Sequence, residues 1–358
     1  MQKVCIVTTS LASGGAERST ALLSQMLCSL GYNVHVVSTK NNIEYAYSGT
    51  LFNLEKAIHG STSNWLKTKV LKAYFKENNF NYVIDNRPYG NFFKEFLLYR
   101  VVFGRAKIIK VIRSFNLVTY FPRNKFLARL VFGGVNKFVA VSKEIKSEIE
   151  LKYGFKNATV IYNPINIEKS EKEIKQFKPL DFKYILFFGR VQEASKNLSL
   201  LIDGYKRSQL PRKQIKLVIL GSGPDLNAVK AKVKACGLVD FITFIPFQAD
   251  PYNYVELAEF TVLTSRYEGF PRSVVESLSM GTPVISVNCK SGPKEIIKDK
   301  YNGLLIKNNC SETLATAMNT FVDNNELYFY CKKNAKQSVK HLSANKIALH
   351  WRKILLNE

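Results

Sequence analysis

The amino-acid sequence predicts an α/β protein built from two doubly wound domains. Its 358 residues exceed what one hydrophobic core usually supports. Short apolar runs rich in β-branched residues alternate with helical stretches, which predicts parallel sheets with right-handed crossovers. This alternation runs twice along the chain, on either side of a polar segment. We expect the two domains to face each other across a cleft, with the ligand beyond the carboxyl ends of the strands.

The first domain is expected over residues 1–165. Its strands are predicted at residues 3–9, 33–39, 81–85, 107–112, 137–142 and 158–163, with helical stretches between them. The first strand leads into Gly14 and Gly15 and then into an amphipathic helix that ends near Gly31. The polar residues 166–181 lack a strand pattern and are predicted to form the interdomain linker.

The second domain, expected over residues 182–340, repeats the pattern. Its strands are predicted at residues 183–189, 215–221, 241–246, 260–265 and 282–287. They are dense in β-branched and aromatic residues, which indicates a sheet buried on both faces. The chain ends in a predicted amphipathic helix, residues 341–358, which carries Trp351 outward from the second domain. We expect this helix to cross back to the first domain.

Composition narrows the class of protein. No apolar run reaches the ~18–20 residues that span a membrane, and the N-terminus lacks a signal-peptide pattern, so we expect a cytoplasmic protein. The six cysteines are scattered, which predicts reduced thiols and no metal site. The net charge is +24, and no acid occurs between Glu95 and Glu144, where ten lysines and arginines lie. Such a surface must meet nucleic acid, an anionic membrane face or a phosphorylated lipid.

Two glutamates in Tyr267–Gly281 are the first candidate site residues. Glu268 is expected in the loop after a buried strand, and Glu276 about one and a half turns inside the following helix, which starts near Pro271. Carboxylates repel phosphate but accept hydrogen bonds from hydroxyl groups, such as the diols of a sugar or a ribose. The alternative is a surface helix that carries two solvated acids.

Other strand ends carry features suited to a nucleotide. Arg190 and Lys196 follow the first strand of the second domain, where two cations can reach one diphosphate. The next strand ends in Gly221-Ser222-Gly223-Pro224, a turn whose backbone can approach a ligand closely. Phe247 follows a third strand and could flank a base. Each feature alone also fits an ordinary connection or solvated surface charge, but a sugar nucleotide has parts that match all of them.

The order of these motifs resembles glycosyltransferase family 4, the retaining enzymes of GT-B fold with two Rossmann-like domains. The motifs, in chain order, are GGAER (14–18), FFGR-x5-K (187–196), GSGP (221–224), EGFPRSVVE (268–276), GTPVI (281–285), SGPKEII (291–297) and NGLLI (302–306). The resemblance covers nearly the whole chain, and the second half is its more specific part.

The resemblance implies roles for individual residues. Glu268 would contact the donor sugar, Glu276 would hold the ribose, and Arg190 and Lys196 would clamp the diphosphate. The remaining donor-binding residues would be Gly14, Gly15, Gly221, Gly223, Phe247, Gly269, Phe270 and Pro271. The sequence contains no Asp-x-Asp, so we expect no metal to bridge the diphosphate and no cofactor. The acceptor would attack from the face that the diphosphate leaves, with retention of configuration.

One departure concerns the first domain. Many members carry a histidine just after the strand that matches residues 107–112, where this chain has Arg113. Asp85, Asn86 and Arg87 lie at the end of another strand of that domain, and we assign them with Arg113 to the acceptor side. Asp85 has the alternative reading of ordinary turn chemistry.

The acceptor is expected to be lipid-linked. Trp65–Lys76 and Phe115–Gly134 mix aromatic residues, leucines and cations without acids, which is typical of a surface that rests on anionic lipid. Alternatively, the apolar residues pack in the core. The motifs SGGAER and NRP also resemble bacterial α-N-acetylgalactosaminyltransferases of lipid-linked glycan assembly. The hypothesis is transfer of a hexose or N-acetylhexosamine, from a UDP-linked donor, to a polyprenyl-diphosphate-linked saccharide at the cytoplasmic membrane face.

Three other classes remain open. A basic nucleic-acid-binding protein would explain the charge, but the chain carries no known reader motif, so no nucleic acid is expected as a partner. A sugar-nucleotide epimerase shares the two-domain architecture and needs no acceptor. A soluble polysaccharide synthase would leave the basic surface unexplained.

Overall fold

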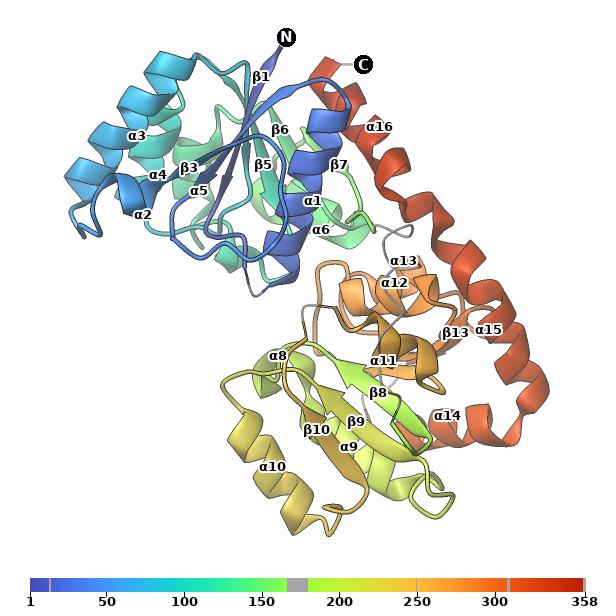
Figure 1. Ribbon diagram of the computed structural model, residues 1–358. Helices are drawn as coiled ribbons and strands as arrows, with labels where there is room; N and C mark the ends of the chain where they lie inside the picture. The colour runs from blue at the N-terminus through green and yellow to red at the C-terminus, as the bar shows by residue number, and fades with distance from the viewer. Residues whose placement is uncertain (13, 166–179, 249, 308–309, 357–358) are drawn as a thin grey trace. The chain divides into compact units, whose positions relative to one another are not determined.

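The computed structural model describes residues 1–12, 14–165, 180–248, 250–307 and 310–356. The chain divides into two compact units (Figure 1). Unit 1 comprises Met1–Pro164 and Ala344–Glu358, and unit 2 comprises Ile165–Ser343. All but the last two residues of the predicted linker, 166–181, lie outside the described residues.

Unit 1 is a seven-stranded parallel sheet flanked by helices. Its strands are β1 (Lys3–Thr8), β2 (Asn33–Ser38), β3 (Thr50–Asn53), β4 (Tyr82–Asp85), β5 (Lys107–Ile112), β6 (Lys137–Ala140) and β7 (Ala158–Val160). Its helices are α1 (Gly15–Ser29), α2 (Leu54–Ala57), α3 (Asn64–Asn78), α4 (Phe92–Leu97), the π-helical turn η1 (Leu98–Val102), the 3-10 turn η2 (Leu117–Thr119), α5 (Lys125–Phe132), α6 (Lys143–Tyr153) and α16 (Ala344–Leu356).

Unit 2 is a six-stranded parallel sheet of the same kind. Its strands are β8 (Tyr184–Phe188), β9 (Lys216–Leu220), β10 (Ile242–Ile245), β11 (Thr261–Leu263), β12 (Val284–Val287) and β13 (Gly303–Ile306). Its helices are α8 (Glu193–Lys196), α9 (Leu198–Arg207), α10 (Leu226–Ala235), α11 (Tyr252–Leu257), α12 (Arg272–Ser279), α13 (Pro293–Ile296), α14 (Ser311–Asp323), α15 (Asn325–Val339) and the 3-10 turn η3 (Lys340–Leu342).

Both sheets reverse their strand order in the middle. The order is β3-β2-β1-β4-β5-β6-β7 in unit 1 and β10-β9-β8-β11-β12-β13 in unit 2. In such doubly wound sheets the loops diverge between β1 and β4, and between β8 and β11, and ligands bind at that point beyond the carboxyl ends. The prediction of an α/β chain with two Rossmann-like doubly wound sheets is confirmed.

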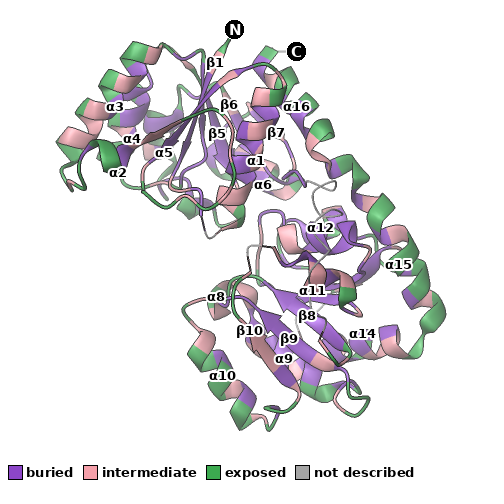
Figure 2. Ribbon diagram, in the orientation of Figure 1, coloured by how far each residue is buried: buried purple, intermediate pink, exposed green. Residues whose placement is uncertain are grey.

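The core of unit 2 follows from the two-residue period of its strands. Ile185 and Phe187 of β8 pack with α9, α10 and α14, whereas Leu186 and Phe188 pack on the other side with α11. Every residue of β8, β11 and β12 is buried, and Figure 2 shows this for β8. These strands therefore read as continuous apolar runs in the sequence, as expected for a sheet covered on both faces.

The last helix belongs to unit 1. Helix α16 packs against α1, and its Trp351 side chain is 3% exposed. The hydroxyl of Tyr82 in β4 donates a hydrogen bond to the carbonyl of Leu355 in the same helix. The amphipathic pattern thus buries its apolar stripe against a unit that ends 180 residues earlier in the chain. Within the described residues, no helix has both the length and the apolar composition needed to cross a membrane.

Candidate functional site

Two glycine turns end the first two strands of unit 2. Gly189 and Gly221 each have φ 147, a conformation that favours glycine. A Cβ on Gly221 would lie 1.9 Å from the Gly189 carbonyl oxygen, and one on Gly223 would lie 2.2 Å from the carbonyl oxygen of Val191. The β8 and β9 loops are therefore packed backbone against backbone, beside the point where the strand order reverses. The predicted donor-binding glycines Gly221 and Gly223 are needed for this packing.

Lys196 and Glu268 form the central ion pair of the site. Lys196 ends α8 and Glu268 lies in the loop after β11, and their Nζ and Oε1 atoms are 2.6 Å apart. Ser265 Oγ donates a second hydrogen bond of 2.6 Å to the same carboxylate oxygen. The hydroxyl of Thr264 holds the carbonyl of Lys196 at 2.9 Å. The structure thus brings together two residues that lie 72 positions apart and were predicted to serve one ligand.

Glu276 is buried within α12, where it needs a cationic partner. Arg272, one turn earlier, donates from Nη2 to Glu276 Oε1 at 2.9 Å, and the two side chains are 12% and 7% exposed. A carboxylate this far from water is costly unless it is paired. Sequence reasoning missed Arg272, although the four-residue spacing within a predicted helix was a sufficient signal.

The loop that carries Glu268 into α12 is held by the next loop along the sheet. Ser291 Oγ donates to the Gly269 carbonyl at 2.7 Å, and the backbone N–H of Glu268 donates to the Lys290 carbonyl at 3.0 Å. Gly292, at φ 102, leaves no room for a Cβ, which would lie 2.4 Å from Pro271 Cδ. The predicted donor-binding residues Gly269, Phe270 and Pro271 are all buried in this arrangement.

Arg190 and Phe247 lie apart from these contacts. Both side chains are exposed, in the loops that follow β8 and β10. Among the described residues, Arg190 has no ion pair. A guanidinium left free at the carboxyl edge of the sheet is available to an anion, but its role in donor binding stays a prediction, as does that of Phe247.

In unit 1 the glycine turn after β1 starts α1. Gly14 is the N-cap residue and Gly15 the first helical residue, so the N–H groups of the first turn point toward the carboxyl end of the sheet. Among the described residues, no side chain caps this end of α1. The donor-binding role of Gly14 and Gly15 also stays a prediction.

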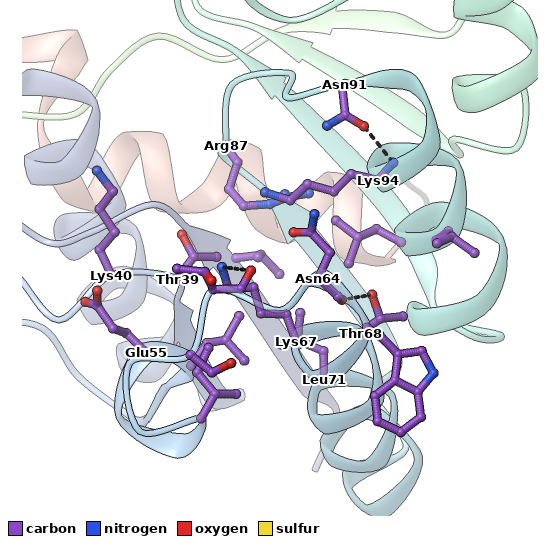
Figure 3. A pocket seen from close by; sticks show the side chains of 18 of the residues that line it. Thr39, Lys40, Glu55, Asn64, Lys67, Thr68, Leu71, Arg87, Asn91 and Lys94 are labelled. Atoms are coloured by element: carbon purple, nitrogen blue, oxygen red, sulfur yellow. Dashed lines mark hydrogen bonds between the residues drawn. The ribbon is translucent and has the colours of Figure 1, made fainter.

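Unit 1 contains a cavity of about 620 Å³ that sequence reasoning did not predict (Figure 3). Residues of α2, α3, α4 and η1 line it, together with Arg87 from the loop after β4. Its lining includes the exposed aromatic residues Trp65 and Phe93.

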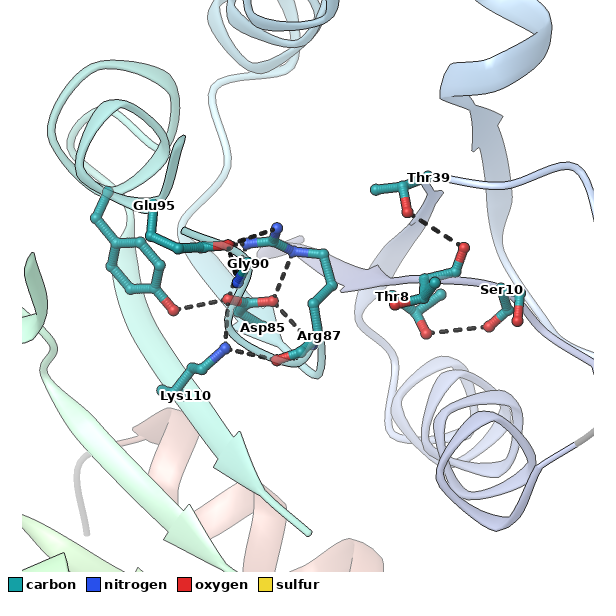
Figure 4. Close-up of polar contacts among 10 residues, drawn as sticks. Thr8, Ser10, Thr39, Asp85, Arg87, Gly90, Glu95 and Lys110 are labelled. Atoms are coloured by element: carbon teal, nitrogen blue, oxygen red, sulfur yellow. Dashed lines mark hydrogen bonds and ion pairs between the residues drawn. The ribbon is translucent and has the colours of Figure 1, made fainter. Parts of the chain in front are cut away.

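Asp85, a predicted acceptor residue, lies at the centre of a buried charge network (Figure 4). Its carboxylate is fully buried and accepts hydrogen bonds from Arg87 at 2.9 and 3.0 Å, from Lys110 at 2.9 Å and from Tyr99 at 2.7 Å. Arg87 also pairs with Glu95 at 3.1 Å. Burial raises the pKa of Asp85, but the positive charges of Arg87 and Lys110 outweigh it, so the net pKa lies well below the ordinary value.

This network changes how Asp85 and Arg87 act. Two buried acids and two buried cations balance, so neither Asp85 nor Arg87 has spare charge for an acceptor. We therefore infer that they fix the loop after β4. Sequence reasoning missed Glu95, Tyr99 and Lys110. Lys110, in the middle of the predicted strand 107–112, was the available signal, because a buried ammonium requires a carboxylate.

Asn86 and Arg113 meet at the carboxyl ends of β4 and β5. Arg113 donates to Asn86 Oδ1 at 3.1 Å and to Asn163 Oδ1 at 2.5 Å. The residue in the position of the family histidine is thus a cation that joins three strand ends, and at neutral pH it cannot act as a base. A role for Asn86 and Arg113 toward the acceptor stays a prediction.

Comparisons with known proteins show the family of the chain. Residues 13–169 match the model described as Glycosyltransferase Family 4, and residues 168–338 match Glycosyl transferases group 1. The chain is 28% identical, over 99% of its length and 100% of the relative's, to the N-acetylgalactosamine-N,N'-diacetylbacillosaminyl-diphospho-undecaprenol 4-alpha-N-acetylgalactosaminyltransferase of Campylobacter jejuni. It is 32% identical, over 47% of each chain, to the lipopolysaccharide 1,6-galactosyltransferase of Salmonella typhimurium.

Solved structures show the same fold. TarM of S. aureus superposes with a TM-score of 0.81 at 13% identity, covering 99% of this chain and 100% of TarM. HepE of Anabaena, in complex with UDP, superposes with a TM-score of 0.76 at 17% identity, covering 100% of both chains. With both halves matched by family models and the whole chain by these structures, the protein belongs to the family 4 glycosyltransferases of GT-B fold.

Proposed function

We propose that this glycosyltransferase moves a hexose or N-acetylhexosamine from a UDP-linked donor to a polyprenyl-diphosphate-linked saccharide, with retention of configuration. The observation that carries the proposal is the preassembled Lys196–Glu268 pair at the carboxyl end of the unit 2 sheet. It offers a cation for a leaving phosphate and a carboxylate for a sugar hydroxyl within one contact distance. The UDP held by HepE supports the choice of nucleotide.

The donor is held by charges of opposite sign along its length. The diphosphate is bound by Arg190 and by the N–H groups of the Lys196 ammonium that do not point at Glu268. Glu276, paired with Arg272, accepts hydrogen bonds from the ribose hydroxyls. Glu268 accepts from a hydroxyl of the transferred sugar, and Ser265 fixes its orientation. These assignments account for the two ion pairs of the site, Lys196–Glu268 and Arg272–Glu276, because in each pair the carboxylate binds hydroxyl groups of the donor.

Catalysis in this scheme is electrostatic. The bond from the sugar to the diphosphate breaks, and negative charge develops on the departing phosphate oxygen. Lys196, held in place by Glu268, and Arg190 stabilise that charge. The acceptor hydroxyl attacks the anomeric carbon on the face that the diphosphate leaves and transfers its proton to the leaving phosphate. The scheme uses no metal bridge, because Lys196 and Arg190 place positive charge beside the departing phosphate.

The lipid-linked acceptor is supported by the Campylobacter jejuni relative, whose name includes an undecaprenyl-diphosphate-linked saccharide. We also propose that unit 1 rests on the cytoplasmic face of an anionic membrane. Trp65 on α3, Phe93 on α4 and Phe126 on α5 expose 71%, 78% and 72% of their surface. Between Glu95 and Glu144 the chain supplies cations without any acid. Exposed aromatic residues among cations suit an anionic lipid surface.

A donor screen tests the proposal. Nucleoside diphosphate release is measured for a panel of sugar nucleotides with and without a polyprenyl-diphosphate-linked acceptor. The expected result is release that depends on a UDP-sugar and on the acceptor, with an α-linked product. Release of a free, epimerised sugar without any acceptor would replace the proposal with the epimerase alternative. Flotation with vesicles that contain anionic lipid tests the membrane contact, and its absence at physiological salt would refute that part.

A further inference from the structure

The cavity of unit 1 is apolar on one side and cationic on the other. Its wall consists of side chains from α2, α3, η1 and their connections, namely Leu54, Ile58, Leu71, Phe75, Leu98 and Phe103. Lys67 and Lys94 reach it from α3 and α4 (Figure 3). Of the side chains that line it, Glu55 alone is acidic, and its carboxylate accepts a hydrogen bond from the backbone N–H of Asn41. The cavity thus matches a molecule that is apolar at one end and anionic at the other.

Lys67 and Lys94 form no ion pair within the described residues. The carboxylates of Asp85 and Glu95, which act on Lys94 electrostatically, are both ion-paired with Arg87. Lys67 Nζ donates only to the Thr62 carbonyl at 3.2 Å, and no ion pair of Lys94 occurs within the described ranges. The Lys94 side chain is exposed at the mouth, yet enough protein surrounds its ammonium that burial lowers its pKa. The positive charges of Arg87 and Lys67 lower that pKa further, and the negative charges of Glu95 and Asp85 oppose this without cancelling it.

Two facing ammonium groups without a counter-ion repel each other, and a bound phosphate or diphosphate removes that repulsion. The apolar wall leads from this cationic side to Trp65, Phe93 and Leu97, which line the cavity and are 71%, 78% and 43% exposed. The same aromatic residues belong to the surface proposed to rest on the membrane. A lipid chain that enters the cavity therefore has a continuous apolar path to that surface.

We propose that this cavity binds the lipid end of the acceptor, with Lys67 and Lys94 holding its diphosphate and the apolar wall holding the first prenyl units. This inference rests on the proposed function. Arg87 supports the site indirectly, because its two buried carboxylates consume its charge and keep the loop after β4 in place. Affinity for the acceptor then depends on the lipid diphosphate as well as on the saccharide.

Kinetics of a paired variant test the assignment. The variant Lys67→Gln/Lys94→Gln removes the two lysines assigned to the diphosphate, and Lys72→Gln/Lys76→Gln removes the same charge from exposed positions of α3 that do not line the cavity. In detergent micelles, where no membrane surface takes part, we expect the first variant to raise the KM for the lipid-linked acceptor at least about tenfold. Its kcat and its KM for the donor should stay unchanged, and the control should match wild type. Equal acceptor KM values for the two variants would overturn the proposal.

A binding assay tests the lipid diphosphate site even where no turnover is measured. Farnesyl diphosphate is titrated into wild type and into the Lys67→Gln/Lys94→Gln variant, beside farnesol, inorganic diphosphate and phosphatidylglycerol micelles. We expect farnesyl diphosphate to bind wild type at least about tenfold more tightly than the variant, and more tightly than the other three probes. No binding, or equal binding of inorganic diphosphate, would refute a lipid diphosphate site. Equal binding of phosphatidylglycerol would make the cavity a general phospholipid site. Binding without glycosyl transfer to any acceptor would refute the proposed function and leave this site standing.

Discussion

Replacing Lys196 with alanine tests the geometry on which the proposed chemistry depends. The substitution removes an ammonium 2.6 Å from Glu268, in a pair whose side chains are 22% and 13% exposed. Loss of one preorganised group that stabilises developing charge typically lowers kcat about 10²- to 10³-fold, or ~2.7–4 kcal/mol. Glu268 keeps its hydrogen bond from Ser265, so the free energy of unfolding should fall by only about 1–2 kcal/mol. Steady-state kcat and a denaturant titration measure the two effects separately.

A matched control lies in the same unit. Lys213 pairs with Asp323 at the same distance of 2.6 Å, but the two side chains are 40% and 46% exposed. Lys213→Ala should therefore leave kcat unchanged and cost less than about 1 kcal/mol of stability. If Lys196→Ala kept a kcat within about threefold of wild type while folded, the ammonium would not stabilise the leaving group. If both variants lost kcat equally, the loss would not come from the site.

Three further substitutions test individual contacts. Glu276→Ala removes the proposed ribose acceptor and should lower kcat/KM for the donor about 10- to 100-fold, as expected for hydrogen bonds to a charged group. A change confined to kcat would contradict this role. Asp85→Asn leaves buried cations uncompensated and should cost about 3–5 kcal/mol in urea unfolding at neutral pH. Because the pKa of Asp85 is lowered in the folded state, its contribution is complete above the ordinary pKa of about 3.9 and fades as pH falls further. The difference from wild type should shrink below pH ~4, and a constant difference would argue against the ion pairs. Gly221→Ala forces a side chain into φ 147 and against the Gly189 carbonyl, so the thermal midpoint should drop by the equivalent of at least about 1–3 kcal/mol. An unchanged midpoint would mean that the two loops can separate without cost.

The fold was predictable because most strands are buried on both faces and stand out as apolar runs. Strand β3 was missed because it lies at the edge of the sheet and Thr50 is exposed, so its residues carry no such pattern. Residues 302–306 were noted as a motif, but β13 within them was not predicted as a strand. It has only four residues, and the last two are only partly buried.

The site was predictable in its residue types but not in its contacts. Glu268 and Lys196 could be chosen because both follow strands, yet their pairing depends on β8 and β11 lying side by side. Asp85 looked like a turn residue or an acceptor ligand, since nothing local reveals that Tyr99 and Lys110 enclose it. The cavity of unit 1 could not be predicted at all, because its lining residues come from separate segments spread between Val7 and Phe103.

The return of α16 to unit 1 has a consequence for how the protein is made. A ribosome delivers the sheet of unit 1 first, but the surface of α1 that receives Trp351 stays uncovered until the last residues emerge. All of unit 2 is synthesised in the meantime. Nascent unit 1 therefore exposes apolar side chains such as Leu23 and Met26 while the whole of unit 2 is synthesised. Such exposure favours binding of a chaperone until α16 docks. A nonsense codon just before Ala344 would give a chain that keeps every proposed donor-binding residue but never covers the apolar surface of α1.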